Sequence, residues 1–593
     1  MNSPRLTGLK NTLMWPALDI GAKLIAALAI NCLLLGPAAA GVGNKYIVLC
    51  YHSVPERYNG DPMAISASNL AEQLAWLRAQ GYTAITLDQV LLAKEGKITL
   101  PDRSFLLSVD DGYEDFYKNI FPVLQLYKVP AVVALVGKWT ETGRPLRNET
   151  DPYFKKQRFA DWSQIREMQR SGLVEIASHS YDLHHGIPAN PQGNTQPAAV
   201  TLQYSKTTAQ YETITQRRAR VRADLTRNSA LIESKLGKRP RIMVWPYGAY
   251  DRVGIEEAAR AGMPVNFTLG DGLASALDSE IVPRILVGKE IPLSTFSYLI
   301  QSAYAPKNLE PLHAIKVNLD RLYDSDAEKQ NQNLGRLIEQ VRELGLNAVV
   351  LQPFVSPTHA GLIEQVYFPN SVLPMRADLL NRASWQLSSR LGVRVYILVP
   401  ISHYAVRDKN KLRRLDLTSA RDRAQILKLY EDFSSHSPLH GLIFMDSDGT
   451  QGQLDVTRDV LKRISYYRPR PRCVYVGEMA DIYFDFPDAE KSKALELRDP
   501  MMVFNAPLDL REDAISDFRK NLPENFIPWV SLPVADLNQD RLPSLIYTIR
   551  ALQRAGVNNF LLDDDGFLDD TAMVNSLRSV VSLKRNPYLH VGQ

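Results

Sequence analysis

The chain has 593 residues, which is too many for one compact core, so two domains of roughly 250–300 residues each are expected. Its composition, 45% hydrophobic and 23% charged without a low-complexity tract, is that of an ordinary globular protein. A formal net charge of +4 is small for this length and argues against a dedicated nucleic-acid binder, which would carry a concentrated basic patch. We therefore expect no nucleic-acid partner.

The first forty residues have the pattern of an export signal. Arg5, Lys10 and Lys23 form a basic leader, residues 24–36 are apolar, and three alanines at 38–40 supply a small-residue cleavage site. The apolar run has about 13 residues, short of the roughly 20 that span a bilayer, which favours a cleaved signal peptide over a membrane anchor. Cleavage leaves only Cys50 and Cys473, far apart in the sequence, so we expect an exported protein without a structural disulfide.

The first half of the mature chain alternates short apolar runs with amphipathic stretches, which is the pattern of an α/β fold. Helices are predicted at 68–80 and 162–171, and the polar, arginine-rich stretch 204–236 is interpreted as one solvated helix. The predicted strands span residues 45–51, 104–109, 131–136, 173–178, 241–245 and 265–269.

Residues 303–311 contain two prolines and no periodicity, and they are interpreted as a linker. After this linker the alternation of predicted strands and helices resumes, with helical segments such as 329–344 and 378–391 between strands. Eight βα units in about 280 residues have the size and count of a (β/α)8 barrel of the TIM type. We therefore divide the chain into a signal peptide (1–40), a first α/β domain (41–302), a linker (303–312) and a barrel domain (313–593). The barrel strands are predicted to begin near Ala314, Asn347, Arg394, Gly441, Val474, Met501, Ile527 and Val557.

Chemically active side chains follow several strands of the first domain. Parallel α/β folds place their sites at the carboxyl ends of the strands, so these side chains are expected to converge. Asp110 and Asp111 come directly after the strand predicted at 104–109. The domain holds four of the ten histidines, each at or just beyond a strand end: His52, His179, His184 and His185.

Two histidines and one carboxylate form a common catalytic zinc shell, which leaves a position open for water. His179 and His184 are five residues apart, a spacing that does not stack on one helix face, so a loop is expected there. Adjacent aspartates point in different directions, so one can bind metal while the other takes a proton. A single histidine of this kind is more often a core or surface residue, and Asp-Asp-Gly alone is more often a plain turn. Their joint appearance at successive strand ends favours a metal site.

Three motifs resemble those of the polysaccharide deacetylase (NodB-homology) family: Ser108-Val-Asp-Asp-Gly112, the His179/His184 pair and Trp245-Pro-Tyr-Gly248. The early Tyr51-His52-Ser53 and the following barrel are similar to one branch of that family. This branch comprises the two-domain poly-β-1,6-N-acetylglucosamine deacetylases of biofilm systems, the PgaB/HmsF type. The resemblance covers nearly the whole mature chain and implies two (β/α) barrels, the first a distorted deacetylase barrel and the second TIM-like.

The resemblance also implies roles for individual residues. Asp111, His179 and His184 would bind a divalent metal, for which zinc is favoured and iron, cobalt or nickel are also suited. Asp110 would be the general base and His52 the general acid that protonates the departing amine. Tyr247 would help to stabilise the oxyanion through its backbone N–H. His185 is a weaker candidate ligand.

Several predicted strand ends of the second domain carry acids: Asp320, Asp446, Asp448, Glu478 and the run Asp563, Asp564 and Asp565. Paired carboxylates across such a face are what glycoside hydrolysis requires, although each acid can equally cap a helix. The resemblance implies binding of partly deacetylated glucosamine polymer and, in some members, its hydrolysis. Ser447 interrupts the usual adjacent-aspartate motif, so both possibilities stay open. If the domain cleaves, Asp446 is the expected acid and Asp448 its partner.

The leading hypothesis is a periplasmic enzyme that removes N-acetyl groups from a β-1,6-linked N-acetylglucosamine polymer during its export. Two alternatives remain: a glycosidase acting through the second barrel, or a non-catalytic polysaccharide-binding export factor. An outer-membrane export porin is a further candidate partner, and both a protein free in the periplasm and one associated with the outer membrane stay open. We expect a monomer.

Overall fold

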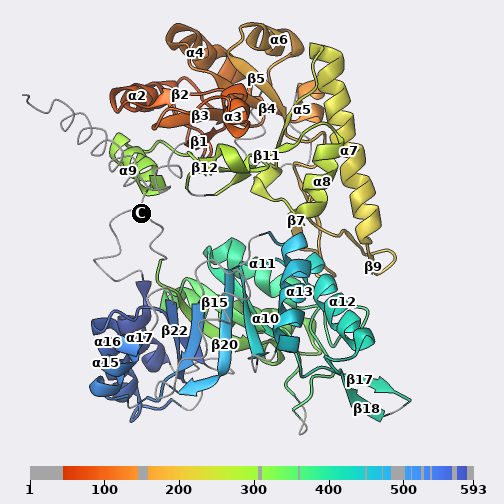
Figure 1. Ribbon diagram of the computed structural model, residues 1–593, viewed down its shortest axis with the longest axis vertical. Coiled ribbons are helices and arrows are strands. Elements are labelled where there is room, and N and C mark those ends of the chain that lie inside the picture. The colour runs from red at the N-terminus through yellow and green to blue at the C-terminus, as the bar shows by residue number, and fades with distance from the viewer. Residues whose placement is uncertain are drawn as a thin grey trace, which may run out of the picture.

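The computed structural model consists of two closed barrels joined in one chain (Figure 1). The signal peptide predicted over residues 1–40 lies outside the part of the chain that the structure describes. Within that part, no helix combines the length and apolar character needed to cross a membrane. The structure describes residues 44–143, 158–270, 272–304, 310–357, 361–409, 411–447, 451–469, 472–481, 501–508, 510–521, 527–534, 537–563 and 571–583.

The first barrel is a ring of seven parallel strands. It closes because β1 (Lys45–Tyr51) pairs with β3 (Ser104–Val109) on one side and with β13 (Ile281–Leu286) on the other. All six predicted strands are confirmed, and β13 is an addition whose Pro283 and Arg284 interrupt the apolar pattern. The remaining strands of the ring are β4 (Ala131–Leu135), β5 (Val174–Ser178), β10 (Ile242–Val244) and β11 (Val265–Leu269).

Two further short strands extend this sheet beyond the ring: β2 (Thr83–Ala84) pairs with β3, and β12 (Ala274–Ser275) pairs with β1 in the antiparallel sense. Helices surround the barrel, so the ring strands are buried on both faces and carry continuous apolar runs. These helices are α2 (Ala67–Ala79), α3 (Leu87–Lys94), α4 (Phe121–Tyr127), α5 (Gly137–Thr142), α6 (Trp162–Arg170), α8 (Arg252–Arg260) and α9 (Leu293–Tyr304).

The interpretation of residues 204–236 as one solvated helix is wrong. The stretch begins with a hairpin of β8 (Tyr204–Ser205) and β9 (Gln210–Tyr211), and helix α7 (Ile214–Leu236) follows. The helix begins after Thr213, which caps its amino-terminal end. The Thr213 side chain accepts from the Gln216 backbone N–H, and the Gln216 side-chain oxygen accepts from the Thr213 backbone N–H. One face of α7 is buried despite its polar sequence, because its polar side chains hydrogen-bond to the barrel.

The second barrel has eight parallel strands in sequence order, and it closes by pairing the last strand with the first. The prediction of two (β/α) barrels is therefore confirmed. Each strand lies where the sequence predicted it, although β23 starts at Phe560 rather than near Val557. The strands are β14 (His313–Asn318), β15 (Ala348–Gln352), β16 (Arg394–Pro400), β19 (Gly441–Ser447), β20 (Arg472–Asp481), β21 (Met501–Asn505), β22 (Ile527–Pro533) and β23 (Phe560–Asp563).

Side chains fill the interior of this second barrel, so it is a packed core and not a channel. Tyr396 on β16 and Trp529 on β22 meet edge to face inside it, with ring centroids 5.1 Å apart. Outside run a hairpin of β17 (Ala405–Asp408) and β18 (Lys411–Arg414) and the helices α10 (Ala327–Leu344), α11 (Leu380–Leu391), α12 (Ala420–His436), α13 (Gln451–Tyr467), α15 (Glu512–Asn521), α16 (Leu542–Arg554) and α17 (Thr571–Val581).

The barrels meet where two hairpins of the first reach the helices α11 to α13 of the second (Figure 1). In the hairpin of β6 (Gly186–Pro188) and β7 (Thr195–Pro197), Asn190 and Gln196 donate to Asn381 of α11 over 2.9 and 2.8 Å. In the next hairpin, Tyr211 donates to the Asp378 carboxylate. Buried polar contacts of this kind fix an orientation, because an unpaired partner would be costly.

Candidate active site

The sequence-predicted residues of the first domain come together at the carboxyl ends of β1, β3, β5 and β10. They line a cavity of about 450 Å³ that is open on one side. His52 follows β1, the two aspartates follow β3, and the histidine loop follows β5. The cavity is lined by the predicted His52, Asp110, Asp111, His179, His184 and Tyr247, together with Asp61, Met63, Tyr113, Trp139, Trp245, Gly248, Leu269 and Arg284.

The Asp-Asp-Gly turn separates two neighbouring carboxylates. Asp111 and Gly112 both adopt the left-handed conformation, with φ of 73° and 75°. Aspartate tolerates this conformation, but position 112 requires glycine, because a Cβ there would lie 2.7 Å from the Leu135 side chain. The turn directs Asp110 toward Arg284 and Asp111 toward the two histidines.

Asp111, His179 and His184 form a trio suited to one metal ion. The Asp111 Oδ1 lies 3.5 Å from the Nε2 of His179 and 3.4 Å from the Nε2 of His184. Ligands bound tetrahedrally to zinc at about 2.0–2.1 Å would themselves be about 3.3–3.4 Å apart. The same Oδ1 is buried and accepts no hydrogen bond from the described residues, which would be costly for a carboxylate without a cation. The donor set therefore fits a divalent metal.

Both histidines are held neutral, as metal ligands must be. Burial lowers the pKa of His179 and of His184 to about 4. The Nδ1 of His179 lies 2.7 Å from the Val244 carbonyl oxygen, which can only accept, so Nδ1 carries the hydrogen. The lone pair of its Nε2 then faces Asp111, in the arrangement that orients ligating histidines in metalloproteins.

Asp110 is held by a buried arginine that the sequence did not identify. Arg284, on β13, donates from Nη1 and Nη2 to the two carboxylate oxygens over 2.6 and 2.8 Å. Burial raises the pKa of Asp110, but the charge and hydrogen bonds of Arg284 outweigh it and hold the pKa well below its usual range. Asp110 is thus ionised at neutral pH. In the sequence, the only indication of this ion pair is a single arginine within an otherwise apolar segment.

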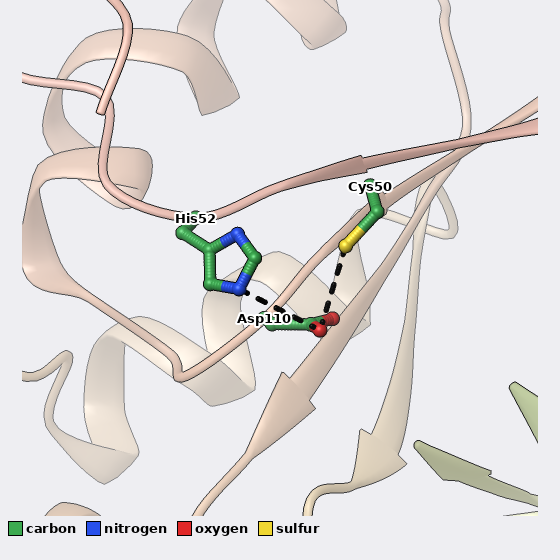
Figure 2. A group of neighbouring side chains, drawn as sticks. All are labelled: Cys50, His52 and Asp110. Atoms are coloured by element: carbon green, nitrogen blue, oxygen red, sulfur yellow. Dashed lines mark hydrogen bonds and ion pairs between the residues drawn. The ribbon is translucent and has the colours of Figure 1, made fainter. Parts of the chain in front are cut away.

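His52 and Cys50 approach Asp110 from β1 (Figure 2). The His52 Nε2 lies 4.0 Å from the Asp110 Oδ2, and the Cys50 thiol donates to the same oxygen over 3.5 Å. Together they form a second group with metal-ligand atoms, but burial raises the pKa of the Cys50 thiol well above its usual value. Because a protonated thiol is a poor ligand and Arg284 already occupies the carboxylate, the Asp111 trio is the better metal site.

Two aromatic rings lie close to the His184 ring. The Tyr247 ring centroid lies 4.6 Å from that of His184, and the Trp139 centroid lies 4.7 Å from it. Tyr247 has a φ of 59° and remains 51% exposed, so it forms part of the cavity rim. The oxyanion role of its backbone N–H stays a prediction.

Of the acids predicted to matter in the second barrel, the side chains of Asp320 and Asp563 are described. Asp563 accepts from the Lys316 ammonium group over 2.7 Å. Asp320 accepts from the Ser356 backbone N–H over 2.8 Å and from the Tyr367 hydroxyl over 2.5 Å. Burial raises the pKa of Asp320, but these bonds outweigh it and lower the pKa, which suits an anion better than a general acid. Asp448 and Asp564 lie outside the described residues, as do the side chains of Asp446 and Glu478.

Comparison with known proteins identifies both halves of the chain. A family described as polysaccharide deacetylase matches residues 97–265, and one described as hypothetical glycosyl hydrolase family 13 matches residues 316–468. The chain is 34% identical over 423 residues to a poly-β-1,6-N-acetyl-D-glucosamine N-deacetylase of Escherichia coli K12, an alignment covering 68% of this chain and 62% of that protein. It thus spans less than two thirds of that relative's length.

Two solved structures are similar to separate halves. A de-N-acetylase from Aggregatibacter actinomycetemcomitans is 39% identical, and the match covers 43% of this chain and 100% of that chain with a TM-score of 0.40. The glycoside hydrolase domain of PgaB (BpsB) from Bordetella bronchiseptica is 22% identical and 99% covered by 46% of this chain, with a TM-score of 0.39. By the family matches, the first half of the chain contains a polysaccharide deacetylase domain and the second a glycosyl-hydrolase-like barrel, and the chain as a whole is similar to the Escherichia coli N-deacetylase.

Proposed function

We propose that the protein is a metal-dependent hydrolase that removes N-acetyl groups from poly-β-1,6-N-acetyl-D-glucosamine. The observation that carries this proposal is the Asp111, His179 and His184 trio, which lies beside an ionised carboxylate that does not belong to it. The substrate is that of the Escherichia coli relative and of a Staphylococcus aureus relative, which is 24% identical over 239 residues covering 40% of this chain and 71% of that protein.

The protein's residues divide the reaction between a base and an acid. A divalent metal bound by the trio would polarise the acetyl carbonyl and lower the pKa of an attacking water. Asp110 receives the proton of that water, and Arg284 holds it in a fixed orientation while it does so. Because its pKa is depressed, Asp110 is a weak base. It can therefore accept the proton only from a water whose own pKa would be lowered by the bound metal.

The second proton transfer is assigned to His52. Its Nε2 lies 4.0 Å from the Asp110 Oδ2, which supports this role. A protonated imidazole there gives its proton to the departing amine, which would otherwise be a poor leaving group. Tyr247, at the rim, would stabilise the oxyanion through its backbone N–H.

The test is acetate release from β-1,6-linked N-acetylglucosamine oligomers, measured with and without a chelator. Asp111→Asn should lose both bound metal and acetate release, because it removes the only carboxylate of the trio. Asp88→Asn is the matched control, since that aspartate is 69% exposed on α3. Unchanged acetate release by Asp111→Asn, or full activity in chelator, would reject the proposal.

A second candidate function is hydrolysis of partly deacetylated polymer by the second barrel, which the glycosyl hydrolase match over residues 316–468 favours. Incubating defined glucosamine oligomers with an Asp110→Asn variant separates the two activities. Shorter products from that variant would assign cleavage to the second barrel. Binding without shortening would instead leave it a polysaccharide-binding domain.

We also propose that the protein is exported to the periplasm after cleavage of residues 1–40 and acts there next to an outer-membrane porin. The basic leader and apolar run of the sequence support the export step. Cell fractionation followed by amino-terminal sequencing should find a mature chain starting near Gly41. A cytoplasmic protein that begins at Met1 would contradict it.

A further inference from the structure

The spacing of the two histidine ligands depends on an unusual loop. Between His179 and His184 the chain turns at Ser180, a residue other than glycine with a φ of 70°. Such a conformation is costly without outside support. Inside the loop, the Leu183 N–H donates to the Ser180 side chain over 3.0 Å, but this local bond fixes only one side of the turn.

The outside support comes from helix α7. The Asp224 Oδ1 accepts the Tyr181 N–H over 2.8 Å, and its Oδ2 accepts the Asp182 N–H over 2.7 Å. Both oxygens of one carboxylate therefore bind consecutive amides directly after the left-handed turn. Bonds between a charged acceptor and backbone N–H groups are stronger than neutral ones.

Two more α7 side chains hold the same loop. Arg227 stacks over the Tyr181 ring at 3.6 Å and donates to its hydroxyl over 2.6 Å. Asn228 donates to Ser178, directly before His179, over 2.7 Å. With Asp224, these residues stand at helical spacings of three and four, which places them on one face of α7.

We propose that Asp224 is a positioning residue for the metal site, which sets the separation of His179 and His184 through the backbone of the loop between them. This inference rests on the proposed metal-dependent function. It gives α7 a task that its arginine-rich sequence did not suggest. Asp224 is not among the residues that line the cavity, and its two hydrogen bonds to the amides of Tyr181 and Asp182 connect it to the loop.

The experiment measures metal affinity of the full chain by competition with a chelator, using Zn²⁺ as the probe. Asp224→Ala should raise the dissociation constant by about 10- to 100-fold, the range found when residues that orient metal ligands are removed. Asp224→Asn keeps one acceptor oxygen and should give an intermediate loss. Saturating Zn²⁺ should restore most of the acetate release of both variants.

Glu233→Ala is the matched control, because Glu233 is an exposed acid on the same helix that pairs with Arg239. It should bind Zn²⁺ as the parent does. Parent-like affinity in a folded Asp224→Ala protein would overturn the inference, and so would failure of both Asp224 variants to fold, which would assign the residue to stability. If the parent itself binds no Zn²⁺, the proposed function fails first.

Discussion

At the scale of single residues, the site depends on the different surroundings of two adjacent carboxylates. Asp110 receives a full countercharge from Arg284, whereas Asp111 is left with a buried oxygen and two neutral histidines. Environments that separate neighbouring titratable groups in this way assign them different roles. Asp110 remains an anion beside the reaction, and Asp111 is suited to bind a cation.

Replacing Arg284 by methionine should leave Asp110 as an unpaired buried charge. Losing one partner of a buried ion pair costs about 3–5 kcal/mol, and the pKa of Asp110 should rise, so the acid limb of kcat/KM should move to higher pH. Urea unfolding and a pH–rate profile measure the two effects. Arg217→Met is the control, because Arg217 forms an equally buried pair with Asp251, at 2.5 Å and away from the cavity. A shifted acid limb in that control would refute the assignment.

The buried histidines make the stability of the metal-free protein depend on pH. With a pKa of about 4 in the folded state and about 6.5 when unfolded, His179 and His184 bind fewer protons folded than unfolded between these values. The free energy of unfolding should therefore fall as the pH drops from about 6.5 to about 4. Denaturation in chelator should show this slope, and His179→Gln should reduce it. A flat profile would be inconsistent with neutral, buried histidines.

At the scale of elements, α5, α7 and the histidine loop pack too closely for any added atom. A Cβ at Gly137, the first residue of α5, would lie 2.1 Å from the Asn228 Oδ1 and 2.9 Å from the Tyr181 ring. The Gly137 N–H also donates to the Ser180 carbonyl over 3.1 Å. Gly137 of α5 therefore lies in close contact with both helix α7 and the histidine loop.

Gly137→Ala should destabilise the protein by about 1–3 kcal/mol, because an overpacked core must shift, and it should weaken Zn²⁺ binding. Gly335→Ala on α10 is the comparison, since a Cβ there meets nothing within 4 Å. That variant should be stabilised by up to about 1 kcal/mol, as expected for alanine in a helix. Thermal unfolding and chelator competition measure both. Equal behaviour of the two variants would count against close packing at Gly137.

At the scale of the whole molecule, several polar side-chain contacts join the two barrels within the described part of the chain. Asn381 accepts from Asn190 and Gln196, and Tyr211 donates to Asp378 while its ring meets that of His436 edge to face at 4.8 Å. Arg218, near the start of α7, donates to Tyr466 of the second barrel over 2.7 Å. Helix α7 thus touches both the histidine loop and the second barrel.

Asn381→Ala should loosen this contact, because two buried amides lose their acceptor at a cost of about 1–3 kcal/mol. Small-angle scattering should show a larger radius of gyration, and protease should cut the hairpins at 186–211 more readily. Arg390→Ala, at the exposed end of the same helix, should do neither. Acetate release from short oligomers should stay within about twofold, since no described hydrogen bond joins the trio to the second barrel. A large loss would mean that the barrels cooperate in catalysis.

The sequence by itself determined the architecture and most of the candidate site. Continuous apolar strands alternating with helices gave six strands of the first barrel and all eight of the second, because periodicity reports burial directly. Polar residues directly after those strands were correctly expected to converge, since parallel strands end on one side of a barrel. His52, Asp110, Asp111 and the two histidines do meet there.

Only the tertiary structure decided which groups surround these residues. Arg284 lies 174 residues from Asp110, and Asp224 lies 42 and 43 residues from the amides that it binds, so neither partnership leaves a local pattern. The buried face of α7 was missed for the same reason. Its polar side chains are satisfied by distant partners, and hydropathy alone cannot distinguish a satisfied buried polar group from a solvated one.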